Sequence, residues 1–241
     1  MKGGRWQYGA IERPRLVIVG AGEFAEIAYE YFTHDSPYEV AGFAVEREFL
    51  AAERLCGRPV VPFEDVAQHF PPERHSAFVA VTYTRLNRVR ARLFAAAREK
   101  GYAMARYVSS AAFVWHTAKL GENCFVFEHN VVQHGVEIGD DVVLWSGNHL
   151  GHRVRLADHC YLTSHVVVSG YCSIGAYAFL GVNSTLADNV SVGANCLIGA
   201  GATVLKDVPD NVIMQGTAAT ASRATALRFF RVPEAEGGGA A

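Results

Sequence analysis

Residues 144–168 read LWSGNHLGHRVRLADHCYLTSHVVV, and every sixth residue of this stretch is Leu or Val. The same spacing runs without a break from Leu120 to Val204, always with Leu, Ile or Val. A helix repeats about every 3.6 residues and a strand about every two, so neither element alone produces this period. A hexapeptide repeat does, because each unit is a short strand plus a turn and three units close one coil of a parallel β-helix.

A second column of the repeat agrees with this interpretation. The residue four positions after each aliphatic one is nearly always small or β-branched, as Cys124, Val142 and Ala178 illustrate. Two positions of the column hold Asn130 and Asn148 instead, and we expect these stacked amides to hydrogen-bond each other because buried polar groups need partners. Four of the five cysteines also lie in this column, which favours reduced thiols in a core over a disulfide or a metal site.

Composition excludes several classes of protein. The chain has 241 residues, a formal net charge of −2 and a hydrophobic content of 50%. No cluster of Lys and Arg suggests nucleic-acid binding. No apolar stretch approaches the roughly 20 residues that span a membrane, and the first residues do not resemble a signal peptide. We therefore expect a cytoplasmic protein without a membrane span.

The repeat occupies only the second half of the chain, and the first half has a different pattern. A buried strand at 16–19, a glycine turn, an amphipathic helix from residue 23 and a second strand at 38–45 begin an α/β domain, and this alternation predicts a small parallel sheet, half of a Rossmann-like fold. The expected parts are a leader (1–14), this α/β domain (15–108), a parallel β-helix of about five coils (109–213) and a C-terminal tail (214–241).

The glycine turn carries the first candidate site. The pattern G-x-G-x-x-A at residues 20–25 follows a strand and opens a helix, and Glu46 follows the second strand. Glycines there let phosphate approach the backbone, and the acid can bind a ribose. A nucleotide sugar, NAD or a purely structural turn are all compatible with this pattern, and the nucleotide sugar is favoured because no second half of a dinucleotide fold follows. The expected substrate-binding residues here are Gly20, Gly22, Glu23, Phe24 and Glu46.

Histidines supply the second candidate site. His116, His134 and His152 share one column on successive coils, and Gly170 is the next member. His152 could be a general base for acyl transfer, with Gly170 leaving room for a thioester and offering its N–H to the developing oxyanion. Histidines from adjacent subunits could instead bind zinc, as in γ-class carbonic anhydrases. Alternatively, they are polar corner residues without a chemical role.

Four motifs resemble the hexapeptide-repeat sugar O-/N-acyltransferases of the sialic acid and bacillosamine type. They are VIVGAGEF (17–24), YVSSA (107–111), GNHLGH (147–152) and SHVVVSG (164–170). The resemblance implies a left-handed β-helix, acetyl-CoA as acyl donor, a nucleotide-linked sugar as acceptor, and a homotrimer with active sites between subunits. It also places the catalytic histidine at His152 and the thioester-contacting glycine at Gly170. Where the family often has an acidic residue after the histidine, this chain has Arg153, so the partner that orients His152 is not evident.

Further expectations follow from that resemblance. We expect Gly170, Gly181 and Gly199 to contact CoA, His134 to contact the sugar, and no metal to be required. Outward aromatic residues such as Trp115, Phe127 and Trp145 would lie exposed in a monomer, which favours the trimer. A role in polysaccharide biosynthesis would fit. The sequence does not distinguish N- from O-acylation, and a zinc-dependent hydratase or a non-catalytic trimeric nucleotide-sugar-binding scaffold are the alternatives.

Overall fold

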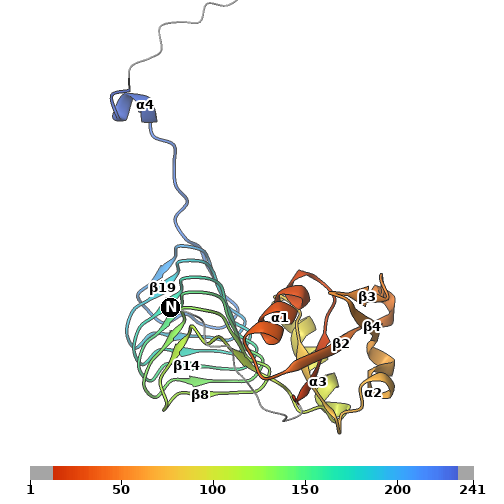
Figure 1. The fold of residues 1–241 in the computed structure, drawn as a ribbon. Helices are drawn as coiled ribbons and strands as arrows, with labels where there is room; N and C mark the ends of the chain where they lie inside the picture. The colour runs from red at the N-terminus through yellow and green to blue at the C-terminus, as the bar shows by residue number, and fades with distance from the viewer. Residues whose placement is uncertain (1–12, 233–241) are drawn as a thin grey trace, which may run out of the picture.

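The computed structural model describes residues 13–232 and consists of a three-sided prism with an α/β domain packed against one of its faces (Figure 1). The predicted leader (1–14) lies almost entirely outside the described residues, as do the last residues, 233–241. The predicted fold class is confirmed: a small, mainly parallel sheet precedes a left-handed parallel β-helix.

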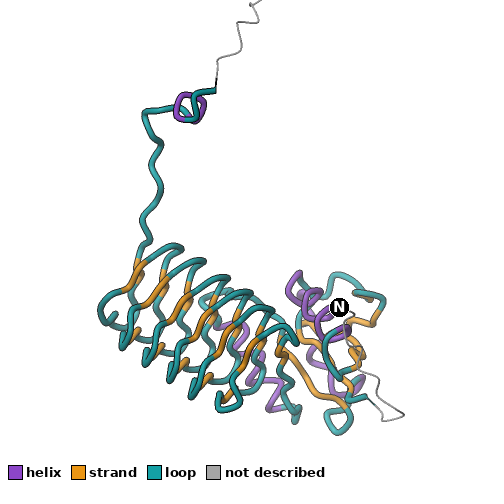
Figure 2. The backbone as a smooth tube through the Cα atoms, turned by 60° about the vertical axis from the view of Figure 1, so that its left-hand side comes forward, coloured by secondary structure: helices purple, strands orange, loops and turns teal. Residues whose placement is uncertain are grey.

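The prism consists of strands of two residues that form three parallel sheets of seven, six and five strands. The first sheet contains β6 (Tyr107–Val108), β9 (Phe125–Val126), β12 (Val143–Leu144), β15 (Tyr161–Leu162), β18 (Phe179–Leu180), β21 (Leu197–Ile198) and β23 (Ile213–Met214). The second contains β7 (Phe113–Val114), β10 (Val131–Val132), β13 (His149–Leu150), β16 (Val167–Val168), β19 (Thr185–Leu186) and β22 (Thr203–Val204). The third contains β8 (Lys119–Leu120), β11 (Glu137–Ile138), β14 (Arg155–Leu156), β17 (Ser173–Ile174) and β20 (Ser191–Val192). Figure 2 shows these strands stacked along the length of the prism.

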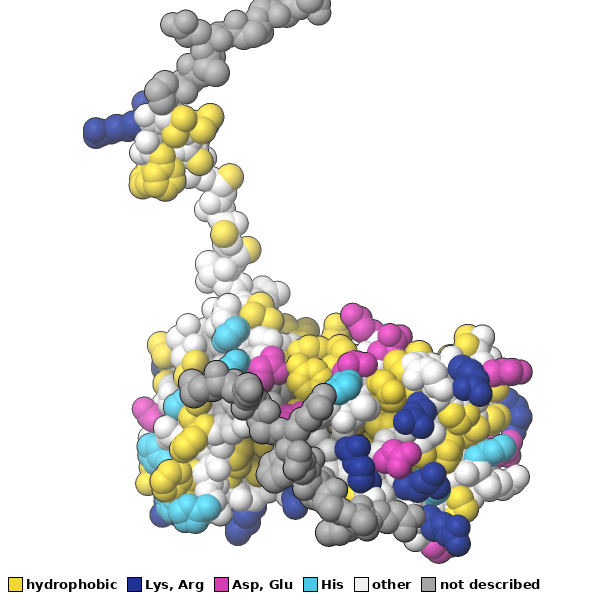
Figure 3. Space-filling view, in the orientation of Figure 1, with side chains coloured by type: hydrophobic (Ala, Val, Ile, Leu, Met, Phe, Trp, Pro, Cys, Tyr) yellow, Lys and Arg dark blue, Asp and Glu magenta, His cyan; other side chains and the backbone are white. Residues whose placement is uncertain are grey.

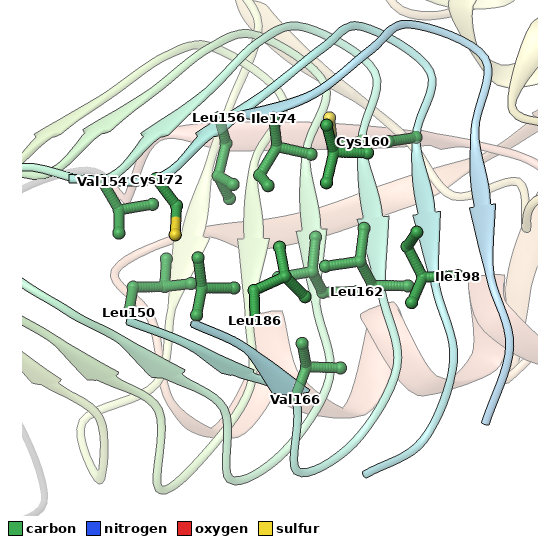
Figure 4. Packing of buried hydrophobic residues seen from close by; sticks show 14 of the residues in the cluster. Leu150, Val154, Leu156, Cys160, Leu162, Val166, Cys172, Ile174, Leu186 and Ile198 are labelled. Carbon is green, nitrogen blue, oxygen red and sulfur yellow. The ribbon is translucent and has the colours of Figure 1, made fainter. Parts of the chain in front are cut away.

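The period of six determines the prism core. Each strand pairs with the strand one coil further on, as in the pair Val132 and Leu150, so the second residue of every strand points into the interior. Figure 4 shows these side chains filling the centre. The buried cysteines belong to this core, and Cys124 donates its thiol hydrogen to the carbonyl of Gly139 at 3.1 Å. Packing of this kind contributes about 1.5–3 kcal/mol for each large aliphatic side chain removed from water.

The two core asparagines do not hydrogen-bond each other, so our expectation that they would is wrong. The Asn130 amide donates to the carbonyls of Phe127 and Trp145, and the Asn148 amide donates to the carbonyl of Trp145. The Asn148 carbonyl in turn accepts the backbone N–H of Val166. Each asparagine therefore hydrogen-bonds backbone groups at its corner of the prism instead of the other side chain.

The α/β domain contains a five-stranded sheet with the order β3-β4-β2-β1-β5. Four of its strands are parallel and β3 is antiparallel to β4. Its strands are β1 (Arg15–Val19), β2 (Glu39–Val45), β3 (Arg54–Leu55), β4 (Arg58–Pro62) and β5 (His75–Val79). Its helices are α1 (Glu23–His34), α2 (Val66–His69) and α3 (Arg88–Glu99), together with the short 3₁₀ turns η1 (Arg47–Phe49) and η2 (Phe63–Asp65).

Alternate residues of β1 pack on opposite sides of this sheet, as strand geometry requires. Leu16 and Ile18 contact α1 and, beyond it, the prism. Val17 and Val19 contact α2 and α3. Both faces are therefore covered, which explains the unbroken apolar run of β1. The covered sheet leaves the carboxyl ends of its strands open on the side next to the prism.

Aromatic side chains attach the α/β domain to the first prism sheet. Phe125 and Phe127 are almost fully buried beneath α1, and the ring of Phe127 stacks on Trp145 with centroids 4.5 Å apart. Tyr161 is equally buried, next to Arg90 of α3. Phe127 and Trp145 do point out of the prism, but the chain's own α/β domain covers them, so the expectation that they would be exposed in a monomer is wrong. Trp115 alone of the three is clearly exposed.

Polar bonds fix the orientation of the two parts. Arg90 of α3 is fully buried and donates from Nε to Asp141 of the prism at 2.9 Å. Asp141 also contacts Nδ1 of His159 at 2.8 Å and accepts from Asn123 at 2.7 Å. At the end of α1, the carboxylate of Asp35 accepts the hydroxyl of Tyr107 at 2.6 Å. A buried ion pair with these additional partners specifies one docking geometry.

After β23 the chain leaves the prism and reaches a short helix, α4 (Ala226–Phe229), in the C-terminal tail (Figure 1). Thr225 caps α4 by accepting the backbone N–H of Arg228 at 3.2 Å. None of the helices in the described chain is long and apolar enough to cross a membrane.

Candidate functional site

A cavity of about 500 Å³ opens at the carboxyl ends of β1, β2 and β5. Ligands of open α/β sheets bind at this edge. Five of the six residues expected to bind substrate line the cavity, and His134 does not: the five are Gly20, Gly22, Glu23, Phe24 and Glu46. The cavity also involves residues that the sequence did not reveal, namely Phe49 after β2, Thr82 after β5, Val89 and Leu93 of α3, and Trp145 of the prism. The α/β domain and the prism therefore build this cavity together.

The two glycines of the turn have different roles. Gly20 has a φ of +134°, and a β-carbon added there would lie 2.5 Å from the carbonyl oxygen of Ala80. Only glycine fits such a position without strain. A β-carbon added to Gly22 would meet no atom within 4 Å, and Gly22 precedes α1 with an extended backbone. Gly20 is thus required by the fold, whereas Gly22 keeps the entrance to the first turn of α1 open.

Glu46 is held rigidly at the edge of the cavity. Its two carboxylate oxygens accept from Nη1 and Nη2 of Arg92 at 2.8 and 2.9 Å, a bidentate pair between β2 and α3. The hydrogen bonds from Arg92 lower the pKa of the Glu46 carboxyl below its usual value. Glu46 is therefore a fixed, ionised acceptor, which suits a hydroxyl-bearing or cationic ligand group.

A strained turn connects β5 to α3 next to the cavity. Arg85, Leu86 and Asn87 all have left-handed backbone conformations, with φ between 51° and 64°. The carboxamide of Asn87 is fully buried and has no hydrogen-bond partner among the described residues. Left-handed non-glycine residues cost roughly 1–2 kcal/mol each, and such strain concentrates at ligand sites. Thr82 and Val89, on either side of this turn, line the cavity, whereas the strained residues themselves do not.

The His152 corner lies between the second and third prism sheets. The imidazole of His152 lies directly on Gly170, where an added β-carbon would be 2.5 Å from Cε1. Tyr171 contacts the same ring edge-on, with centroids 4.9 Å apart, and Gln133 accepts the His152 backbone N–H at 2.9 Å. Among the described residues no side chain hydrogen-bonds the imidazole, so its nitrogens are available to a ligand or a neighbouring subunit.

Gly170 differs from our expectation in one respect. Its N–H is not free, because it donates to Asp188 at 2.8 Å. The space above its α-carbon is taken by the His152 ring rather than left for a thioester. The expectation that this N–H faces an oxyanion is therefore wrong for this conformation, and glycine is needed here because any side chain would displace the imidazole.

The other expected residues are divided between two corners. His134 lies one coil before His152, where Nδ1 contacts the hydroxyl of Thr117 at 2.8 Å. Gly181 and Gly199 lie at the corner between the first and second sheets, in the column that contains Trp145, so the structure does not bring them to Gly170. An added β-carbon at Gly181 would approach the backbone of Ala200 at 2.6 Å, so coil stacking already requires glycine there.

Histidine side chains gather on the prism surface away from the α/β domain (Figure 3). At the Trp145 corner, the ring of His165 lies over Gly147, where an added β-carbon would be 2.6 Å from Nδ1. This pair repeats the relation of His152 to Gly170 at a different corner.

No three His, Cys, Asp or Glu side chains within residues 13–232 converge in a way that could hold a metal ion.

Comparison with known proteins identifies the class. Residues 117–152 and 171–206 match the family model for the bacterial transferase hexapeptide (six repeats). A search of curated proteins found no match. Among solved structures, a histidine-to-asparagine variant of perosamine N-acetyltransferase from Caulobacter crescentus, in complex with CoA and GDP-perosamine, is 27% identical, with 86% of this chain and 96% of that chain covered and a TM-score of 0.75.

The acetyltransferase domain of PglB from Neisseria gonorrhoeae FA1090 has the same fold, with 22% identity, 84% of this chain and 97% of that chain covered, and a TM-score of 0.74. The repeat and the fold thus define a hexapeptide-repeat transferase with an N-terminal α/β domain. The resemblance to the sugar acyltransferases of this class is confirmed, and the solved structures similar to the chain include sugar N-acetyltransferases.

The contrast between the two turn glycines gives a first prediction. Gly20→Ala should lower the free energy of unfolding by about 1–3 kcal/mol, because the new methyl group meets the Ala80 carbonyl in a strained backbone conformation. Gly22→Ala should change it by less than about 0.5 kcal/mol, since its position is open. Chemical denaturation of the two variants measures both values. Equal losses at the two sites would contradict the assigned roles.

Proposed function

We propose that the protein transfers an acyl group, most simply acetyl, from acyl-CoA to an amine or hydroxyl group of a nucleotide-linked sugar. The observation that carries this proposal is the cavity at the strand ends, with its open Gly22 and its fixed Glu46, on the same chain as an accessible imidazole on the prism. PerB from Caulobacter crescentus, solved in complex with CoA and GDP-perosamine, is 27% identical over 86% of this chain, which supports the same pairing of ligands here.

In the proposed reaction the acceptor nitrogen or oxygen attacks the thioester carbonyl carbon. Nε2 or Nδ1 of His152 accepts the proton that the acceptor loses, and the C–S bond breaks to release the CoA thiolate. The imidazolium then returns its proton to the sulfur, so the enzyme is unchanged. Histidine suits this task because its ordinary pKa lies near neutral pH. Gly170 and Tyr171 hold the ring in place without bonding either nitrogen.

The relatives offer support for assigning the base to a histidine. Two solved variants of the Caulobacter enzyme have a histidine replaced by asparagine or alanine, and both hold CoA and GDP-perosamine together. A histidine that is dispensable for binding both ligands is compatible with a chemical role. We extend this reasoning to His152, with His134 as a neighbour that contacts the sugar.

We further propose a homotrimer with active sites between subunits. The cavity includes Trp145 at one corner of the second sheet, whereas His152 lies at the opposite corner of the same sheet. The second sheet is not covered by the α/β domain, and Phe113, Trp115 and Val167 are exposed on it or beside it. A neighbouring subunit packed along this sheet would cover them and bring its own His152 toward the cavity.

CoA would lie along the same interface in this arrangement. Above Trp145 the column continues through Thr163 to Gly181 and Gly199, which leave a corner free of large side chains. A slim pantetheine arm fits beside such a corner, with the His152 imidazole of the other subunit, which covers Gly170, near the thioester. The thioester supplies the activated acyl group, and the residues named here bind it and exclude water.

Two other functions remain to be tested against this one. A zinc-dependent hydratase like the γ-class carbonic anhydrases would place histidines from two subunits around a metal, but it assigns no role to the cavity in the α/β domain. A non-catalytic nucleotide-sugar-binding scaffold would use the cavity and leave His152 idle. Cytoplasmic location and a role in polysaccharide biosynthesis, where nucleotide sugars are the building blocks, complete the proposal.

Substitution of the proposed base separates these functions. His152→Asn should lower the turnover number by about 10²–10⁴-fold while leaving the affinity for acetyl-CoA nearly unchanged, because the base acts on the acceptor's proton. His134→Asn, one coil away, should have a much smaller effect on turnover. The release of free CoA thiol with a nucleotide-linked amino sugar as acceptor measures the rate. Full turnover by His152→Asn, or loss of activity with a zinc chelator, would refute the assignment.

Mixed assemblies test whether the site is shared between subunits. Gly22→Val should block the cavity and His152→Asn the chemistry, so each homogeneous variant should be nearly inactive. When the two are co-expressed in equal amounts, random assembly should pair an intact cavity with an intact His152 at about a quarter of the interfaces. Activity well above that of either variant alone is expected. A mixture as inactive as its components, in assemblies verified to contain both variants, would place the whole site within one chain.

A further inference from the structure

We propose that residues 223–232 of the C-terminal tail bind the surface of a membrane that contains anionic lipids. Phenylalanine and leucine side chains of this segment would enter the apolar boundary of the bilayer, and its arginines would contact the lipid phosphates. Such a segment lies on the membrane and does not span it. The inference is independent of the proposed function, because these residues line neither the substrate cavity nor the His152 corner.

The tail is separate from the packed body of the protein. The last strand, β23, ends at Met214, and every residue from 217 to 232 is exposed. Within the described chain, the hydrogen bonds of residues 222–232 are all local, from the Thr225 cap to the bond between the N–H of Val232 and the carbonyl of Leu227. Figure 1 shows α4 clear of both the prism and the α/β domain. Neither coil stacking nor domain docking therefore explains the side chains of this segment.

Large apolar side chains are concentrated at the far end of the tail. Phe229 and Phe230 are 74% and 73% exposed, and their rings contact each other edge-on with centroids 5.1 Å apart. Leu227 and Val232 beside them are exposed as well. Figure 3 shows a hydrophobic cluster at this end of the tail, well away from the prism. Exposed apolar groups that cluster in this way are typical of a surface that binds another apolar phase.

Arginines alternate with these apolar residues and decide which apolar phase fits. Arg223, Arg228 and Arg231 lie within nine residues of each other. The sequence has no acidic residue between Asp210 and Glu234, although the whole chain has a net charge of −2. The segment is therefore a local concentration of positive charge around an apolar cluster. A bilayer with anionic headgroups is complementary to both features, because it has negative charge directly above an apolar interior.

The turn of helix in α4 separates the two kinds of side chain. Thr225 fixes the start of α4 by capping it. Leu227 and Phe230 are three positions apart, so they share one side of the turn. At 3.6 residues per turn, Arg228 points away from that side. An apolar side that faces the bilayer and a basic side at the level of the headgroups are the arrangement of an interfacial anchor.

Symmetry would strengthen this short anchor in the proposed homotrimer. A three-fold axis places the three tails at the same height, so they would reach one membrane surface together. Weak contacts that are linked in this way combine, because the second and third bind at a high effective concentration. Residues 215–224 can extend over roughly 30 Å, which keeps the body of the protein away from the lipid. The cavity and His152 lie on earlier coils and would remain open to the solution.

Vesicle flotation of the full-length protein tests the anchor. Vesicles of phosphatidylcholine alone would be compared with vesicles in which about a third of the lipid is phosphatidylglycerol. We expect the wild type to bind the anionic vesicles at least tenfold more tightly, because each arginine near an anionic surface strengthens binding several-fold. High salt should release most of the bound protein, since it screens charges at an exposed surface.

Substitutions in the tail separate the apolar from the basic contribution. The double variant Phe229→Ser/Phe230→Ser should bind anionic vesicles at least tenfold more weakly, because it removes two aromatic rings that would otherwise leave water. The double variant Arg228→Gln/Arg231→Gln should lose most of the preference for anionic over neutral vesicles. A melting curve checks that each variant folds like the wild type.

The last coil of the prism offers a matched control. Leu205 and Lys206 are also an exposed apolar residue next to a basic one, but they lie on the prism and not on the tail. Leu205→Ser/Lys206→Gln should therefore float like the wild type. Equal loss of binding in this variant and in the phenylalanine variant would show that the end of the prism binds the lipid, and the tail anchor would be wrong.

Three further results would overturn the inference. The first is a wild type that floats with neither kind of vesicle, and the second is equal binding to neutral and anionic vesicles. The third is a wild type that, without lipid, sediments as a larger assembly than the phenylalanine variant, because the tail would then bind a second copy of the chain. None of these measurements requires acyl transfer, so the anchor and the proposed function can fail separately.

Discussion

Stacking of the coils eighteen residues apart is the constraint on which the rest of the molecule depends. Backbone hydrogen bonds between successive coils, such as those that pair Val132 with Leu150, leave each position in a fixed column. A column that points inward must be aliphatic or small, and a column at a corner needs glycine where the next coil comes close. Gly181, whose β-carbon would approach Ala200 at 2.6 Å, is explained by this rule alone. Residues with chemical roles therefore occur in the columns that the constraint leaves free.

The three faces of the prism consequently have different surroundings. The first sheet bears aromatic residues and is covered by the α/β domain, whose orientation Arg90 and Asp141 fix through a buried ion pair. The third sheet is charged, with Lys119 and Arg155 on either side of Glu137. The second sheet is left open, and its two corners carry the cavity residue Trp145 and the candidate base His152. The proposed split site follows from this division of the faces.

The period of six was sufficient to predict the prism, its core and the column that contains His152 and Gly170. The glycine turn and the acid after the second strand correctly indicated the cavity at Gly22 and Glu46. The sequence could not show that Arg92 holds Glu46, because the pair joins a strand end to a helix 46 residues away. The sequence also wrongly predicted that Phe127 and Trp145 would be exposed in a monomer. The repeat shows that a side chain points out of the prism, but it does not show that another part of the chain covers it. Three aromatic residues in one column of the eighteen-residue repeat, Phe125, Tyr161 and Phe179, were an available signal for a covered face.

The most direct test of the account is acyl transfer by the purified wild-type protein. Acetyl-CoA would be incubated with a panel of GDP-, UDP- and dTDP-linked amino sugars, with mass spectrometry of the sugars and measurement of free CoA thiol. The account predicts that at least one nucleotide-linked sugar gains a single acetyl group, with one CoA thiol released for each product molecule. Binding of a nucleotide-linked sugar without any transfer, or zinc-dependent hydration of carbon dioxide in its place, would contradict it.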